Sequence, residues 1–139
     1  MKNAVAVLLM IIALDSVSFG DVLIIANKDV PETILSQKEV REIFLGKRVQ
    51  WSDNSRIRFV VISNPELHSM FLKKYVRLPH VEWEIYWKRI VFTGRGMPPE
   101  TINSETEMVE FISKKHGAVG YVSSGAKLEN REIKIIGDQ

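Results

Sequence analysis

Four polar residues, Ser63, Asn64, His68 and Ser69, stand where an apolar run from Ile57 to Ile62 gives way to a helical pattern. Serine hydroxyls, an amide and an imidazole are hydrogen-bond donors suited to a small anion. A strand that leads directly into a helix also presents free backbone N–H groups and the positive end of the helix dipole. This junction is therefore the best candidate for anion capture in the sequence.

Two neighbouring residues weaken that interpretation. Pro65 has no backbone N–H, so the helix start loses one donor. Glu66 places a negative charge where an anion would sit. The sequence therefore leaves two interpretations open, a ligand site and a plain helix cap.

A second candidate is the segment Thr93-Gly94-Arg95-Gly96, because a Gly-x-Gly pair exposes backbone N–H groups and a guanidinium can meet an oxyanion with a planar fork. Its spacing matches neither a dinucleotide fingerprint nor a P-loop, and no strand precedes it. A helix C-cap followed by a proline-locked loop is the favoured interpretation. Arg95 and Asn27, which follows the first apolar run, remain candidate ligand contacts.

Signals for catalysis and metal binding are poor. The three histidines are scattered without HxxxH or HExxH spacing, so zinc has no evident ligand set. No GxSxG motif exposes a serine as a nucleophile, and the chain has no cysteine. We therefore predict a protein that is not an enzyme and that has no cofactor and no catalytic residues.

Residues 1–20 have the pattern of a secretion signal. Lys2 gives a basic start, Ala4 to Leu14 is almost wholly apolar, and Ser18 and Gly20 are small residues before a cleavage site at Asp21. The apolar stretch is shorter than the roughly 20 residues that span a bilayer. A buried N-terminal helix is the alternative. We expect an exported, soluble periplasmic protein without stable membrane insertion after cleavage, or else a secreted one.

The formal net charge is +2, which is too small to indicate nucleic-acid binding, where a domain-wide basic excess is expected. A mildly basic balance is compatible with a small anionic ligand. The absence of cysteine means that no disulfide supports the fold and that no cysteine can carry a lipid at the cleavage site.

Apolar runs and capping patterns predict an α/β fold, in which helices flank one mixed sheet, over a single domain at residues 21–139. Strands are expected at 22–26, 57–62, 118–122 and 133–136, and helices at 36–46, 64–75, 80–92 and from 104 onward. The predicted order is β-α-β-α-α-α-β-β. Trp83, Tyr86 and Trp87 share one side of the third helix, which favours packing onto the sheet over an aromatic ligand platform.

Four segments together resemble the phosphate ABC transporter substrate-binding family, especially short members that look like a single lobe. They are VLIIANKDVP from Val22, LSQKEVREIFLGK with its following Trp51, IYWKRIVFTGRGMPP from Ile85, and GAVGY from Gly117. The resemblance implies a type 2 periplasmic-binding fold and places these segments in the second lobe. It also implies phosphate binding in the cleft between two lobes and delivery to a membrane permease.

The chain departs from that family at the expected pocket. In the family, the strand similar to Ile57–Ile62 leads through an arginine into a Ser-Gly-Thr turn that wraps the oxyanion. Here the stretch from Ser63 to Phe71 contains neither, and the first-lobe half of the pocket is missing. The resemblance therefore supports the fold of that family more strongly than it supports binding of the family's ligand.

The leading hypothesis is a periplasmic solute-binding module for phosphate or a related oxyanion in ABC-type transport or sensing. Its site is expected at Ser63, Asn64, His68 and Ser69, with Asn27 and Arg95. The alternative is a protein-interaction or sensor-accessory module that kept the lobe and lost the anion pocket, with a partner on the Trp83 and Trp87 surface or the open sheet edge. A permease, a receptor or a second copy of the chain is the expected partner, and nucleic acid is not.

Overall fold

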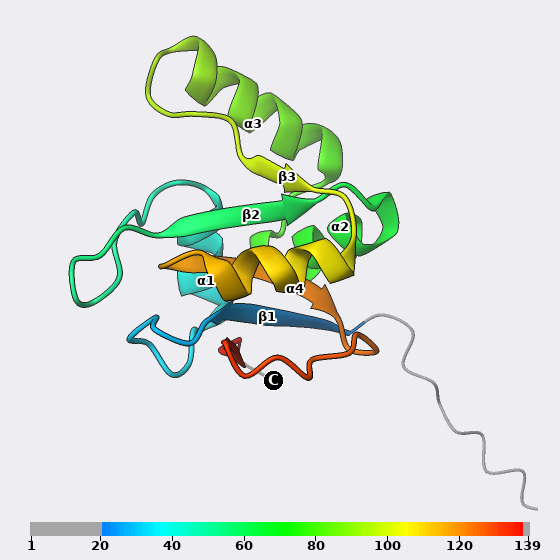
Figure 1. Ribbon diagram of the computed structural model, residues 1–139. Coiled ribbons are helices and arrows are strands. Elements are labelled where there is room, and N and C mark those ends of the chain that lie inside the picture. Colours follow the sequence, from blue (N-terminus) through cyan, green and yellow to red (C-terminus); the bar gives the residue numbers. More distant parts are fainter. Residues whose placement is uncertain (1–20, 138–139) are drawn as a thin grey trace, which may run out of the picture.

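A five-stranded mixed sheet forms the centre of the molecule, with the strand order β3-β2-β4-β1-β5 (Figure 1). The computed structural model describes residues 21–137, so the predicted signal at 1–20 lies outside the described residues. The strands are β1 (Val22–Asn27), β2 (Arg58–Ile62), β3 (Glu100–Ile102), β4 (Ala118–Ser123) and β5 (Ile133–Ile135). β2 is parallel to β3 and β4, and β1 is antiparallel to β4 and β5. The predicted α/β class with a mixed sheet is confirmed.

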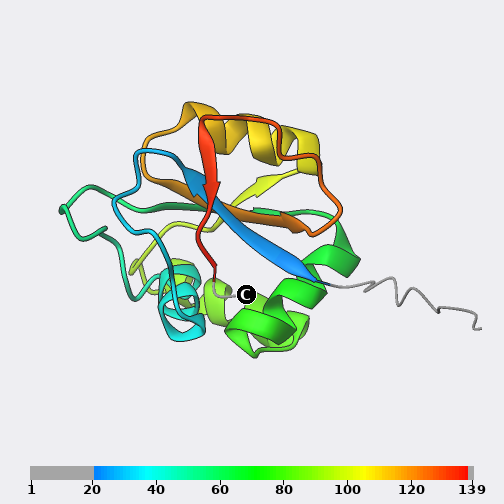
Figure 2. The same cartoon turned by 90° about the horizontal axis from the view of Figure 1, so that it is seen from below.

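Helices cover both faces of the sheet. They are α1 (Gln37–Phe44), α2 (Pro65–Phe71) with its π-helical extension η1 (Leu72–Val76), α3 (His80–Phe92) and α4 (Glu105–Lys114). Figure 2 shows α4 on one side of the strands and α1 and α2 on the other. Among the described residues, no helix is long and apolar enough to cross a membrane.

Side-chain caps set the starts of α1, α2 and α4 as the sequence predicts. Ser36 and Glu39 form a complete capping box at α1. Asn64 accepts a hydrogen bond from the Leu67 N–H at α2, and Ser104 accepts one from the Glu107 N–H at α4. Each cap satisfies a backbone donor that the first helical turn would otherwise leave unpaired.

The core lies between the sheet and the helices on each face. The ring of Tyr121 on β4 stacks on Phe71 of α2 at a centroid distance of 3.9 Å. On the other face, Met108 of α4 packs so close to Gly120 that a Cβ there would lie 2.6 Å from the Met108 sulfur. Glycine in β4 therefore lets α4 approach the strand closely, as a side chain would push the helix away.

The two segments that carry most of the family resemblance contact one another. Trp51, in the loop after α1, is buried, and its Nε1–H donates to the Gly117 carbonyl at 3.0 Å. The Arg58 N–H donates to the same carbonyl at 3.0 Å. The tryptophan therefore joins the loop after α1 to the start of β4.

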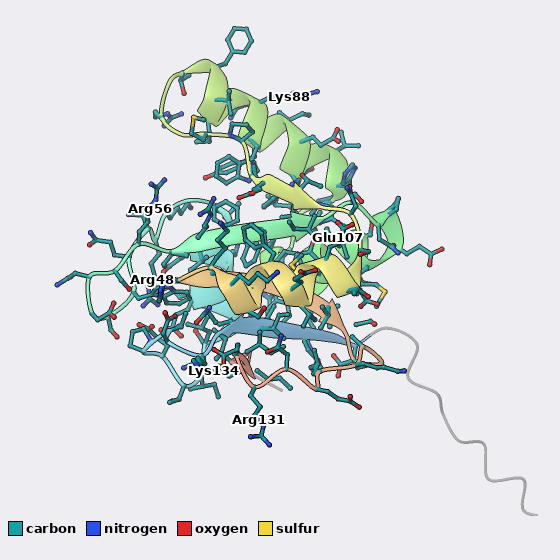
Figure 3. The ribbon with its side chains drawn as sticks, viewed as in Figure 1. Arg48, Arg56, Lys88, Glu107, Arg131 and Lys134 are labelled. Carbon is teal, nitrogen blue, oxygen red and sulfur yellow. The ribbon has the colours of Figure 1, made fainter. Side chains whose placement is uncertain are left out.

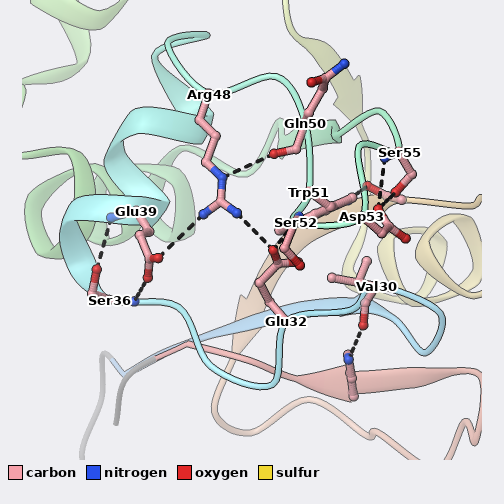
Figure 4. A network of polar contacts seen from close by, with 12 residues as sticks. Val30, Glu32, Ser36, Glu39, Arg48, Gln50, Trp51, Ser52, Asp53 and Ser55 are labelled. Atoms are coloured by element: carbon pink, nitrogen blue, oxygen red, sulfur yellow. Dashed lines mark hydrogen bonds and ion pairs between the residues drawn. The ribbon is translucent and has the colours of Figure 1, made fainter.

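An ion-pair network holds the loop after α1 against the loop after β1 (Figure 4). Arg48 Nη2 lies 2.9 Å from Glu32 Oε1, and Arg48 Nη1 lies 3.5 Å from Glu39. The same Glu32 oxygen accepts the Ser52 N–H at 2.7 Å. Because Glu32 and Arg48 are both mostly shielded from solvent, this network positions Trp51 more firmly than an exposed pair would.

The predicted element order misses one strand. β3 lies between α3 and α4 and pairs with β2 in parallel register, with Val60 opposite Glu100. It has three residues, follows Pro98-Pro99 and occupies the sheet edge, so it has one hydrogen-bonded neighbour. Such a short edge segment carries no alternating pattern long enough to recognise.

Helix α3 lies beyond the β3 edge and is held to the body by its aromatic side chains (Figure 1). Trp83 and Trp87 are buried, and the Tyr86 hydroxyl donates to the Leu45 carbonyl at 2.5 Å. The packing interpretation of this cluster is therefore confirmed. Gly94 follows the helix with a φ of 68°, which makes the Gly-x-Gly segment a helix end.

Candidate functional site

The loops that follow β2, β3 and β4 meet at one end of the sheet, which we name the carboxyl edge (residues 63–64, 103–104 and 123–124). They meet because β2 is parallel to both of its neighbours. Two helices, α2 and α4, begin there. In open α/β sheets, ligands bind outside the carboxyl ends of the strands, so this edge is the candidate site.

Four of the predicted contacts directly follow β2 or lie in α2, the helix that begins at this edge. The Ser63 N–H donates to the Ile102 carbonyl at 2.8 Å, which ties the end of β2 to the end of β3. The side chains of Ser63, Asn64 and Ser69 are exposed. Asn64 uses its side-chain oxygen to cap α2, so its NH₂ group is the part left for a ligand.

His68 differs from these three because it is buried, with 6% of its surface exposed. The Tyr121 hydroxyl accepts the Ile62 N–H at 3.1 Å and lies 2.5 Å from His68 Nδ1. A hydroxyl can donate one hydrogen bond and accept two, so the tautomer of His68 decides whether the phenol donates to Nδ1 or accepts from it. In the tautomer in which the phenol donates to Nδ1, His68 carries its ring proton on Nε2 and donates from that nitrogen.

The charge state of His68 follows from its surroundings. Burial, with a smaller contribution from nearby His80, lowers the pKa of His68 from 6.5 to about 4, and Glu84 opposes this shift. The ring is therefore neutral at pH 7. Burial also raises the pKa of Tyr121 well above its usual range, so the phenol stays protonated at neutral pH. The pair supplies hydrogen-bond geometry and no positive charge.

Carboxylates dominate the charge at the carboxyl edge. Glu66 lies in the first turn of α2, and the Glu105 carboxylate at the start of α4 accepts the Ser123 N–H at 2.5 Å. Lys74 reaches the same edge but lies 2.7 Å from Asp21. A hydrogen bond from Lys74 lowers the pKa of Asp21, and the same bond raises the pKa of Lys74. This cation is therefore neutralised within the chain.

The other two predicted contacts lie at the opposite end of the sheet. Asn27 ends β1, which runs antiparallel to β4, and its amide donates to the carbonyls of Ile112 and Ser113 at 2.9 and 3.3 Å. Arg95 precedes β3 and donates from Nε to the Thr93 hydroxyl at 3.1 Å. The structure does not bring either residue together with Ser63, Asn64, His68 and Ser69.

Three residues of this site were absent from the sequence prediction: Tyr121, Glu105 and Ser123. Tyr121 lies inside the GAVGY segment, where it reads as a core residue. Glu105 and Ser123 are 18 positions apart and meet because α4 returns the chain beside β4. A search at the ends of the predicted strands would have found Ser123, although their parallel alignment is a tertiary property.

Metal binding has no support within residues 21–137, where no group of three or more histidine or acidic side chains could hold an ion. The groups at the carboxyl edge can donate hydrogen bonds, and none is an activated nucleophile paired with a base.

Comparison with known proteins identifies the fold. No protein-family model matches the sequence, and no curated protein is detectably similar. Solved structures do match. A protein described as a phosphate ABC transporter substrate-binding protein, with bound phosphate, from Clostridium perfringens is 14% identical with a TM-score of 0.65, over 84% of this chain and 44% of the other.

Two further structures give the same result. PstS from Borrelia burgdorferi is 17% identical with a TM-score of 0.63, over 85% of this chain and 47% of its own. An ABC-type phosphate transport receptor from Vibrio cholerae is 19% identical with a TM-score of 0.55, and the match covers 84% of this chain and 45% of the receptor. This chain thus spans less than half of each of these neighbours, and it has the fold of a single lobe of a periplasmic-binding protein.

Proposed function

We propose that this chain is an exported solute-binding module that holds phosphate or a related small oxyanion at its carboxyl edge. The observation that carries the proposal is the convergence of two helix starts, α2 and α4, on the carboxyl ends of parallel strands. Helix starts present N–H donors and positive dipole ends to an anion. The neighbour from Clostridium perfringens holds phosphate in a structure that includes this fold.

The donors in this proposal are the hydroxyls of Ser63 and Ser69, the Asn64 NH₂ group and the His68 Nε2–H. Affinity is expected to be low, with a dissociation constant of about 1 mM, because one lobe cannot enclose and desolvate its ligand. Glu66 and Glu105 lower it further through charge repulsion. A tighter complex requires a second body, a permease, a receptor or another copy, that covers the open side.

Calorimetric titration of the purified protein with phosphate and sulfate tests the site. The variant Ser63→Ala/Ser69→Ala should bind about tenfold more weakly, because it loses two donors. Glu66→Gln should bind about threefold more tightly, because it removes a carboxylate from the helix start. Arg95→Ala is the matched control at the opposite end of the sheet and should bind as the unmodified protein does.

A flat titration at millimolar phosphate and sulfate would contradict the proposal. The remaining candidate would then be the protein-interaction module, which the two carboxylates at the carboxyl edge, Glu66 and Glu105, favour. An equal loss in Arg95→Ala and in the serine variant would show binding outside the proposed site.

Export is part of the same proposal, and it rests on the pattern of residues 1–20 and on the periplasmic-binding fold. Mass spectrometry of protein recovered from a periplasmic extract should find a chain that begins at Asp21. Recovery of the intact chain from the cytoplasm alone would contradict export.

A further inference from the structure

Helix α3 has two apolar sides, of which the body of the protein covers one. Trp83 and Trp87 face the sheet and are buried. Val81, Ile85 and Phe92 are 64%, 50% and 94% exposed. These three residues are four and seven positions apart, so they form one stripe along the helix. A helix in a chain that functions alone normally exposes a polar face in this place.

A groove runs beside this stripe, between α3 and the edge strand β3. Its volume is about 360 Å³, and its walls include Trp83, Trp87 and Val91 of α3 and Val61, Pro98 and Pro99 on the sheet side. Within the described residues, the buried Nε1–H of Trp87 has no hydrogen-bond partner. The groove meets the stripe at Phe92, and Glu84 and Lys88 of α3 also line it, so the apolar surface that a partner can fill has charged residues along it.

Charges along α3 indicate which partner fits. Glu82 and Glu84 lie in the N-terminal half, and Lys88 and Arg89 lie in the C-terminal half. Figure 3 shows Lys88 pointing away from the sheet. When the α3 helix of a second copy packs antiparallel to the first, with the two-fold axis at the level of residue 86 along the helix, Glu84 lies opposite Lys88 of the second copy. Parallel packing would set like charges together.

We propose that α3 is a self-association surface through which two copies of this chain pair antiparallel. Each copy buries its stripe of Val81, Ile85 and Phe92 against the other, and side chains of each helix enter the other's groove. A two-fold interface requires a self-complementary patch, and α3 has both the apolar residues and the reversed charges. The proposal does not depend on oxyanion binding.

Sedimentation analysis of the purified protein tests the proposal over concentrations up to about 0.1 mM. The unmodified protein should form a dimer whose fraction rises with concentration. Ile85→Glu should raise the dissociation constant of the dimer at least tenfold. Ile34→Glu is the matched control, because Ile34 is 62% exposed in a loop away from α3. That variant should dimerise as the unmodified protein does, and circular dichroism should show that both variants are folded.

Charge reversal tests the antiparallel geometry. Glu84→Lys alone and Lys88→Glu alone should each weaken the dimer, because each puts like charges across the axis. The double variant Glu84→Lys/Lys88→Glu should restore it, since both partners of each pair are then reversed. A monomer at every concentration, a dimer unaffected by Ile85→Glu, or no recovery in the double variant would overturn the proposal.

Discussion

Gly117 is the residue at which the two most informative sequence segments meet. Its φ is 70°, and a Cβ there would lie 2.3 Å from the Arg56 carbonyl oxygen. Its own carbonyl accepts the Trp51 indole N–H. The position therefore combines a backbone conformation that favours glycine with a close approach that excludes any side chain.

Gly117→Ala is expected to lower the free energy of unfolding by about 2 kcal/mol or more, because the left-handed backbone and the contact with Arg56 both become strained. Gly125→Ala is the matched control, since a Cβ at Gly125 meets no atom within 4 Å. Urea unfolding of both variants measures the difference. Equal stability of the two variants would contradict this account.

His68 gives the protein a pH-dependent stability with a definite sign. Its pKa in the folded protein is about 4 and its ordinary value is 6.5, so between these values the unfolded chain binds more protons. Stability therefore falls as the pH drops through this window. Above this window the His68 ring is uncharged in both the folded and the unfolded chain, so its contribution to stability no longer depends on pH.

The variant His68→Gln should lose that part of the pH dependence. Between pH 7 and pH 5 the unmodified protein should lose about 2 kcal/mol more of its unfolding free energy than the variant does. Urea unfolding at the two pH values measures this difference. The other histidines are common to both proteins, so the same pH slope in both would show that His68 titrates normally.

Asn27 acts on the scale of the elements, because it joins the end of β1 to the end of α4. Its amide donates to two carbonyls in the last turn of α4, and its oxygen accepts the Asp29 N–H at 3.1 Å. Carbonyls at a helix end have no partner within the helix. A polar residue that follows an apolar strand can therefore look like a ligand contact while it serves as a cap.

Asn27→Ala should lower the unfolding free energy by about 1–3 kcal/mol, because the carbonyls of Ile112 and Ser113 lose a buried donor. Phosphate affinity should not change, because the carboxyl edge lies at the other end of the sheet. Unfolding and calorimetry on the same preparation separate the two effects. Lost binding with unchanged stability would place Asn27 in the site.

The elements differ in how far the sequence could reveal them. The helices at 37–44, 80–92 and 105–114 have side-chain caps or repeated apolar spacing, and both signals are local. Strand β3 has neither, since Glu100–Ile102 forms a strand only through its hydrogen bonds to β2. Its existence depends on a neighbour about 40 residues away in sequence, as the pairing of Val60 with Glu100 shows.

At the scale of the whole molecule, stability is expected to be uneven. β4 lies at the centre of the sheet between β2 and β1, whereas α3 lies beyond the β3 edge and packs through one side. Backbone amides open locally at a free energy that depends on how much buried structure must be disrupted. α3 is therefore the part expected to open most easily among the helices that contact the sheet.

Hydrogen exchange followed by mass spectrometry should show α3 opening at a free energy about 2–4 kcal/mol below that of β4. The exchange is measured at low protein concentration, because a dimer formed through α3 would dissociate there and would not protect the helix. Equal protection of the two segments would show that α3 is part of the same cooperative unit as the sheet.

The sequence by itself determined the local features of this protein. Apolar runs and caps predicted the α/β class and, within residues 21–137, four of the five strands and the helices, because these signals act within a few residues. The four resembling segments pointed to a single lobe of a periplasmic-binding fold, which the solved structures support. The aromatic spacing on α3 correctly predicted packing against the sheet.

Only the tertiary structure decided which polar residues lie together. The direction of each strand placed Ser63 and Ser69 at one end of the sheet and Asn27 and Arg95 at the other. Folding also brought Glu105 to Ser123 and exposed a second apolar side on α3. Strand direction and helix docking arise from contacts between distant residues, and such contacts leave no local pattern in one sequence.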